Sequence, residues 1–115
     1  MTKKISLKNA EHYKWGEMCD GWHLVKNDAL SIILERVPAG KSEVRHYHNR
    51  SRQFFFILEG EGRIELDNET VKLSKNEGIE IPPETVHKFR NDSDKDVTFL
   101  VISSPKSNGD RVNCE

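Results

Sequence analysis

Apolar and polar residues alternate with a period of two along much of the chain. Ile64 and Leu66 alternate with charged residues, and Val71 and Leu73 do the same after an intervening turn. This alternation is typical of a strand with one face toward a core and the other toward water. No stretch of the sequence has a convincing apolar period of 3.6 over three turns. The pattern therefore predicts an all-β domain, a sandwich or barrel of short antiparallel strands.

Turn-forming residues separate the expected strands. Asn27-Asp28 is a plausible hairpin turn, Cys19-Asp20-Gly21 is another turn, and Pro38-Ala39-Gly40 ends a strand because proline cannot donate to a ladder. The charged segment 91–96 is expected to be a loop, and residues 104–115 a tail. The expected strands are Trp22–Lys26, Leu30–Val37, Arg63–Leu66, Thr70–Leu73, Ile79–Ile81, Val86–Arg90 and Val97–Ser103.

One run, residues 54–58, is apolar at every position. Adjacent residues on a strand face opposite sides, so this strand needs an apolar cover on both faces. Phe55 and Ile57 are expected inside the barrel, while Phe54, Phe56 and Leu58 face outward. Their cover is either the chain's own second sheet or a second copy. Because exposing all three would leave an adhesive patch, we expect a homodimer.

Length, charge and cysteine content narrow the function classes. A chain of 115 residues suffices for one core, so residues 1–115 are interpreted as a single domain. The 18 Lys+Arg and 19 Asp+Glu residues argue against a globally basic nucleic-acid-binding protein. The apolar runs are too short to span a bilayer, and the N-terminus lacks the apolar core of a signal peptide. The two cysteines form no CxxC pair, so we expect a cytoplasmic protein. The balanced charge and the short apolar runs predict that it has no nucleic-acid or membrane partner.

Two histidines have a spacing that suits a metal site. His46 and His48 are two residues apart, so on a strand both imidazoles leave the same face, roughly 6.5–7 Å apart along the backbone. Side chains at that separation can converge on one ion at about 2.0–2.1 Å each. Alone, the pair is a weak indication. A third ligand must come from elsewhere in the chain, and the candidates are His87, Gln53, His12, His23 and several carboxylates.

Two longer motifs surround these residues. The first, in residues 40–60, consists of Gly40, five residues, His46, one residue, His48, four residues, Gln53, six residues and Gly60. The second, in residues 78–91, includes Pro82, His87 and Asn91. With both motifs in register, the sequence resembles the cupin superfamily. Two positions depart from the usual pattern, because Gln53 stands where the family usually has Glu, and Glu84 stands where Gly is usual.

The resemblance implies a cupin barrel, a small antiparallel jelly roll or double-stranded β-helix, with a metal held inside its mouth. His46, His48 and His87 are implied as ligands, and Gln53 matches the carboxylate ligand position. An amide oxygen is neutral, so a divalent ion would keep about +2 formal charge and bind an anionic substrate or hydroxide more readily. Alternatively, Gln53 leaves that position to water. The ion could be zinc, nickel, iron, manganese or cobalt, with iron slightly disfavoured because no carboxylate is at the expected position.

Residues near the motifs are candidates for a substrate pocket. Counting by twos from positions 53 and 87 places Phe55 and Phe89 inside the barrel, where we expect them to line an apolar pocket around the metal. Arg50 and Arg52 lie in the loop before Gln53. Of these, Arg52 is interpreted as a pocket residue that could hold a substrate carboxylate or phosphate.

The leading functional hypothesis is a metal-dependent enzyme that acts on a small polar molecule, by isomerisation, oxygenation or decarboxylation. Glu43, Glu80 or Tyr13 could supply proton transfer, and the sequence does not choose among them. One alternative is a non-catalytic module that senses or stores a small ligand in the same pocket, and another is a structural dimer with an empty barrel. His12 and His23 are expected at the surface or at an interface, and residues 5–15 would cross to the partner in a dimer.

Overall fold

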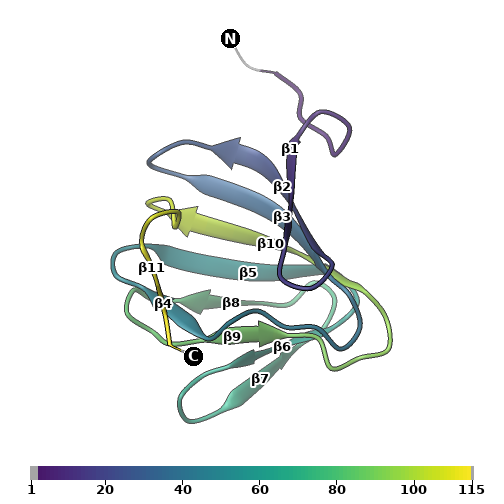
Figure 1. Cartoon of the computed structure of the whole chain (residues 1–115), viewed down its shortest axis with the longest axis vertical. Helices are drawn as coiled ribbons and strands as arrows, with labels where there is room; N and C mark the ends of the chain where they lie inside the picture. Colours follow the sequence, from purple (N-terminus) through teal and green to yellow (C-terminus); the bar gives the residue numbers. More distant parts are fainter. Residues whose placement is uncertain (1–2, 115) are drawn as a thin grey trace.

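The computed structural model describes residues 3–114, and every regular element in that range is a β-strand (Figure 1). The predicted all-β jelly-roll fold is confirmed. No described residue belongs to a helix long and apolar enough to cross a membrane. The strands are β1 (Glu11–Trp15), β2 (Cys19–Lys26), β3 (Ser31–Val37), β4 (His46–His48), β5 (Arg52–Glu59), β6 (Gly62–Glu65), β7 (Thr70–Leu73), β8 (Gly78–Ile81), β9 (Lys88–Arg90), β10 (Val97–Ser104) and β11 (Arg111–Asn113).

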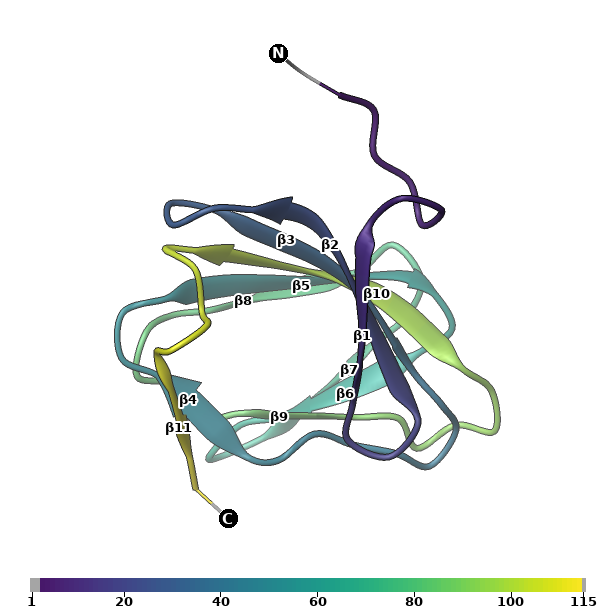
Figure 2. The same cartoon turned by 45° about the horizontal axis from the view of Figure 1, so that its top comes forward.

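Three antiparallel sheets form the walls of the barrel. The six-stranded sheet has the order β1-β2-β3-β10-β5-β8, the three-stranded sheet β7-β6-β9, and the two-stranded sheet β11-β4. The six-stranded sheet lies across from the three-stranded sheet, and the β4–β11 pair lies at one side between them (Figures 1 and 2). The strand that carries the two closely spaced histidines is therefore part of the barrel wall.

Side chains that alternate along the strands fill the space between the sheets. Phe55 and Ile57 are buried on β5, whereas Phe54, on the other face, is 38% exposed. Phe89 from β9 and Phe99 from β10 stack at the centre, with ring centroids 4.1 Å apart. The prediction that β5 is apolar on both faces, with Phe55 and Ile57 inside, is confirmed.

The expected turn at residues 19–21 is wrong, because these residues begin β2. The turn lies earlier, at residues 16–18, where Gly16 and Met18 have positive φ angles of 53° and 65°. Gly21 has a packing role instead. A Cβ placed there would lie 2.3 Å from the ring carbon Cζ of Tyr13, so only glycine leaves room for the tyrosine ring.

Part of the C-terminal segment that was expected to be a tail forms a strand. Residues 111–113 form β11, which pairs with β4 so that Arg111 lies opposite His48 and Asn113 lies opposite His46. A three-residue strand carries too little periodicity to be recognised in a sequence. At the other end of the chain, residues 11–15 form β1, which pairs with β2 at the edge of the six-stranded sheet.

Candidate metal centre and its cavity

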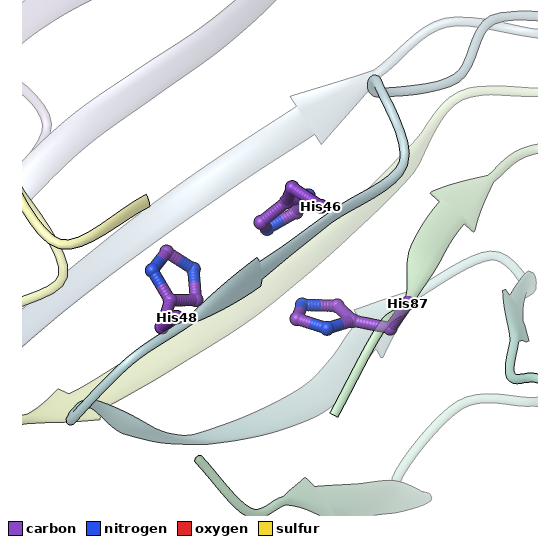
Figure 3. A group of neighbouring side chains, drawn as sticks. All are labelled: His46, His48 and His87. Atoms are coloured by element: carbon purple, nitrogen blue, oxygen red, sulfur yellow. The ribbon is translucent and has the colours of Figure 1, made fainter. Parts of the chain in front are cut away.

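Three buried histidines converge inside the barrel (Figure 3). His46 and His48 leave the same face of β4, and His87 lies just before β9. Backbone hydrogen bonds join the two segments directly, from His46 N to His87 O at 3.0 Å and from His87 N to His46 O at 2.9 Å. These main-chain hydrogen bonds fix His87 beside His46, which explains how residues far apart in sequence share one site.

The free ring nitrogens of this cluster suit a metal ion. One nitrogen from each ring lies within 4.8 Å of the others. Nδ1 of His46 and Nδ1 of His87 are engaged with the carbonyl oxygens of Val44 and Thr85, each at 2.8 Å. This leaves Nε2 of His46 and Nε2 of His87 as possible ligand atoms, as in many metal sites where a carbonyl fixes the histidine tautomer. Nε2 of His48 and of His87 is buried and has no hydrogen-bond partner among residues 3–114.

Burial keeps these imidazoles neutral at physiological pH. Burial, together with the neighbouring His87 ring, lowers the pKa of His46 to about 3 and that of His48 to about 4. Burial lowers the pKa of His87 as well. Only a neutral imidazole has a free lone pair for a metal. The three rings are therefore in the protonation state that a metal site requires.

Gln53, on β5, leaves an amide oxygen without a partner. The side chain is buried, and its Nε2 donates to Oγ of Ser103 at 3.1 Å. Its Oε1 is buried and accepts no hydrogen bond from the described residues. Gln53 lines the same cavity as His46 and His48. A neutral oxygen beside three neutral nitrogens is a donor set that fits a divalent transition metal.

The histidines open onto a cavity of about 580 Å³. The apolar part of the cavity wall is formed by Phe55, Ile33 and Val101. The same cavity is lined by ionisable or polar side chains, namely Tyr13, His23, Glu35, Glu43, Lys26, Lys106 and Arg111. This volume lies in the usual range for small-molecule sites, which combine mostly apolar walls with a few placed polar groups.

Two of the predicted pocket residues lie elsewhere. Arg52 immediately precedes Gln53 on β5, so its side chain leaves the opposite, outer face, where it pairs with Glu80 at 2.6 Å. This position also removes Glu80 as a proton-transfer candidate in the cavity. Phe89 does point inward, but it stacks on Phe99 in the core and does not line the cavity. Of the three expected pocket residues, only Phe55 lines the cavity.

Several cavity residues were missed by the sequence analysis. Glu35 faces inward because it alternates with Ile33 and Val37 on β3, and that alternation was the one available indication. Burial, together with the nearby Glu43 carboxylate, raises the pKa of Glu35 to about 8. Burial also raises the pKa of Glu43 to about 7. His23, expected at the surface or at an interface, lines the cavity.

Comparison with known proteins agrees with this fold. The chain is 39% identical to an uncharacterised protein, MJ1618, from Methanocaldococcus jannaschii, over 72% of this chain and 66% of that protein. It is 35% identical to the polyketide synthase CurC from Streptomyces cyaneus, over 57% of this chain and 43% of that protein. The chain thus spans less than two thirds of the length of either relative.

Solved structures with the same fold include the polyketide cyclase RemF from Streptomyces resistomycificus. The TM-score is 0.85 at 19% identity, covering 100% of this chain and 87% of that one. A family model described as a cupin domain matches residues 33–103. Since this match contains β4, the Gln53 strand and His87 and spans more than half of the 115 residues, the chain belongs to the cupin family.

Proposed function

We propose that this cupin binds one divalent transition-metal ion through His46, His48 and His87, with Gln53 as a fourth ligand, and is a metal-dependent enzyme that acts on a small molecule in the cavity. The observation that carries the proposal is the convergence of three buried, neutral imidazoles whose ring nitrogens lie within 4.8 Å of one another. Buried polar atoms without partners are costly, and a bound ion would satisfy them.

When bound, the ion supplies a Lewis acid that polarises an oxygen atom of the substrate. The chain itself supplies groups that can move protons. Glu43 lines the cavity with Oε1 at 3.9 Å from Nδ1 of His46, and the same oxygen accepts a hydrogen bond from Phe89 N at 2.9 Å. Tyr13 and Glu35 line the cavity as well. Carboxyl groups that titrate near neutral pH are suited to general acid–base catalysis, which favours isomerisation or decarboxylation over oxygenation.

The alternative is a non-catalytic cupin that stores or senses a small ligand in the same cavity. It is supported by Lys26 and Lys106, which line the cavity and pair with Glu11 and Asp28 at 3.0 and 2.9 Å. These cationic side chains are suited to hold an anionic ligand, and no catalytic step requires them. The two functions differ in whether a bound molecule is converted.

The test begins with metal analysis of protein purified without a histidine tag and then reconstituted with zinc, nickel, iron, manganese or cobalt. We expect about one ion per chain, and we expect His48→Ala to lose it. His12→Ala is the matched control, because His12 is exposed and lies outside the cavity. Loss of metal by neither variant would contradict the site.

The second step is turnover. The loaded protein is incubated with 2-oxo acids, phenols and sugars, and products are followed by NMR and mass spectrometry. Conversion of a panel compound that requires both the ion and Glu43 supports the enzyme hypothesis. Stoichiometric metal and tight binding of a panel member without conversion would instead support the binding protein.

A further inference from the structure

A second polar cluster lines the cavity on strands that carry none of the three histidines. We call it the hydroxyl pole, and it consists of Tyr13 on β1, His23 on β2 and Glu35 on β3. These strands form one end of the six-stranded sheet, while Gln53 belongs to β5 near the other end. The cavity therefore has polar groups on separate parts of its wall.

The hydroxyl pole depends on a glycine between two side chains. In the sheet register, Tyr13 lies opposite Gly21, and Gly21 lies opposite Glu35. Because Gly21 has no side chain, the Tyr13 ring can lie over β2, where a Cβ would be 2.3 Å from Cζ. The tyrosine hydroxyl then reaches across one strand and donates to Oε2 of Glu35 at 3.3 Å. The Tyr13–Glu35 hydrogen bond in the cavity wall thus depends on the pairing of β1, β2 and β3.

The pole has unused hydrogen-bonding capacity. Within residues 3–114, the only hydrogen bond to the Glu35 carboxyl group comes from Tyr13, and no ion pair involves Glu35. Nδ1 of His23 is buried without a partner in that same range, and its ring lies 5.0 Å from the Tyr13 ring between centroids. Burying such groups is unfavourable unless something hydrogen-bonds to them. A ligand in the cavity would supply the missing partners.

The pole is uncharged near neutral pH, which selects the kind of group it can hold. Burial and the Glu43 charge raise the pKa of Glu35 to about 8, against the opposing effects of Tyr13 and Arg111. Burial lowers the pKa of His23, so that ring is neutral too. A neutral carboxyl group can both donate and accept, as a hydroxyl group can. The pole therefore matches a neutral hydroxyl better than a phosphate or carboxylate.

Apolar side chains line the cavity between β3, which carries Glu35, and β5, which carries Gln53. Phe55, Val101 and Ile33 lie opposite one another across β5, β10 and β3, and all three line the cavity. The β3 backbone is two strand spacings from that of β5, or about 10 Å. A molecule that spans this wall is larger than a keto acid of three or four carbons, and a cavity of about 580 Å³ has room for fused or linked rings.

We propose that Tyr13, His23 and Glu35 bind a hydroxyl group on a ring-containing ligand whose other end places an oxygen at the three-histidine centre. The inference rests on the proposed function, because it takes the metal end of the ligand from that proposal. The ligand class is a hydroxylated, planar ring compound with a carbonyl or enol oxygen at one end and a separate hydroxyl at the other.

The test uses full-length, zinc-loaded protein and fluorescent probes. The reference probe is 3-hydroxyflavone, which offers a ketone and an adjacent hydroxyl to the ion, and the others are its analogues with one further hydroxyl at the 6, 7 or 4′ position. We expect at least one analogue to bind about tenfold more tightly than the reference probe. In Glu35→Leu, and more mildly in Tyr13→Phe, the ratio of the analogue's affinity to that of 3-hydroxyflavone falls toward one.

Glu80→Gln is the control, because Glu80 lies on the outer face beside Arg52, and it should keep the gain. Circular dichroism and zinc content show that each variant is folded and loaded. No gain in the wild-type protein, a gain retained by Glu35→Leu, or no binding of any probe to zinc-loaded protein overturns the hydroxyl pole. Those results leave the proposed metal site standing. Failure of the wild-type protein to bind zinc overturns the proposed function, and the pole with it.

Discussion

At the scale of single residues, the candidate metal centre is distinguished by uncharged ligand atoms. The three imidazoles carry no charge at neutral pH, and Gln53 contributes an amide where related sequences usually have a carboxylate. A bound divalent ion would keep its full formal charge and attract electron-rich oxygen atoms of a ligand. If Gln53 ligates the ion as proposed, the same neutrality would weaken metal binding and strengthen the Lewis acid.

Replacing Gln53 with Glu is expected to tighten zinc binding by about tenfold or more, because a carboxylate adds an opposite charge to the donor set. Competition titration with a zinc indicator measures the change. Gln53→Leu serves as the paired variant and should weaken binding. Unchanged or weaker affinity in Gln53→Glu would show that the side chain at position 53 does not contact the ion.

The pKa of Glu35 predicts how the stability of the metal-free protein depends on pH. Burial raises this pKa from 4.5 to about 8, so between these values the folded chain binds a proton that the unfolded chain has lost. The contribution of Glu35 to stability therefore falls as pH rises through this window. Four histidines oppose this trend, because their pKa values are lowered from 6.5 and the unfolded chain binds protons there that the folded chain does not. Their opposition fades about one pH unit above 6.5, once the unfolded chain has also lost those protons.

Urea unfolding of the metal-free protein at about pH 7.25, 7.75 and 8.25, where Glu35 titrates and the histidines are largely neutral in both states, checks this expectation. The midpoint should decrease with pH in the wild-type protein, and Glu35→Gln should flatten that decrease while a contribution from Glu43 persists. Glu80→Gln, on the outer face, is the control. Equal slopes in the wild type and Glu35→Gln would mean that Glu35 is ionised throughout the range.

At the scale of strands, the sequence predicts what is periodic and local. The alternation on β5 correctly places Phe55 and Ile57 inside, and the His-x-His spacing places His46 and His48 on one face of β4. The position of His87 follows from the family motif and not from periodicity. These features depend on one strand each, or on spacing within a known pattern.

What the sequence does not predict depends on pairings between distant segments. The Tyr13–Glu35 contact needs the register of three strands and the absence of a side chain at Gly21, which was interpreted as a turn. Arg52 shows a simpler error, because a residue one position from an inward Gln53 must face outward. Side-chain alternation alone would have excluded it.

The β4–β11 pair joins the C-terminal segment to the strand that carries His46 and His48. Asp110 precedes β11, and its Oδ2 accepts hydrogen bonds from Arg50 N at 2.9 Å and Ser51 N at 2.8 Å, just after β4. Asp110→Ala should loosen β4 and weaken zinc binding several-fold without altering any ligand. Isothermal titration with zinc measures the effect. Asp67→Ala, in the exposed loop between β6 and β7, should leave affinity unchanged, and equal values for both variants would contradict the coupling.

At the scale of the whole molecule, one face is more apolar than a monomer requires. On the outside of the six-stranded sheet, Leu100 lies opposite both Phe56 and Leu34, and Ile102 lies opposite both Phe54 and Ile32. These side chains are only partly buried, and Phe54 is 38% exposed. The surface continues to Trp22, opposite Leu34. The sequence indicated only the β5 part of this surface, since the rest follows from the strand order.

We expect this outer face to be the interface of a homodimer. Contiguous exposed apolar surface of this kind marks interaction sites, and a twofold pair is the commonest closed arrangement. Sedimentation equilibrium at micromolar concentration should give about twice the chain mass of 13.3 kDa. Leu100→Lys places a charge at the centre of the face and should give the monomer mass while the folded spectrum and zinc content persist, because Leu100 faces away from the cavity. Arg63→Ala, on the three-stranded sheet, is the control and should remain dimeric. A concentration-independent monomer for the wild-type protein would contradict the interface, and a dimer that survives Leu100→Lys would place it on another surface.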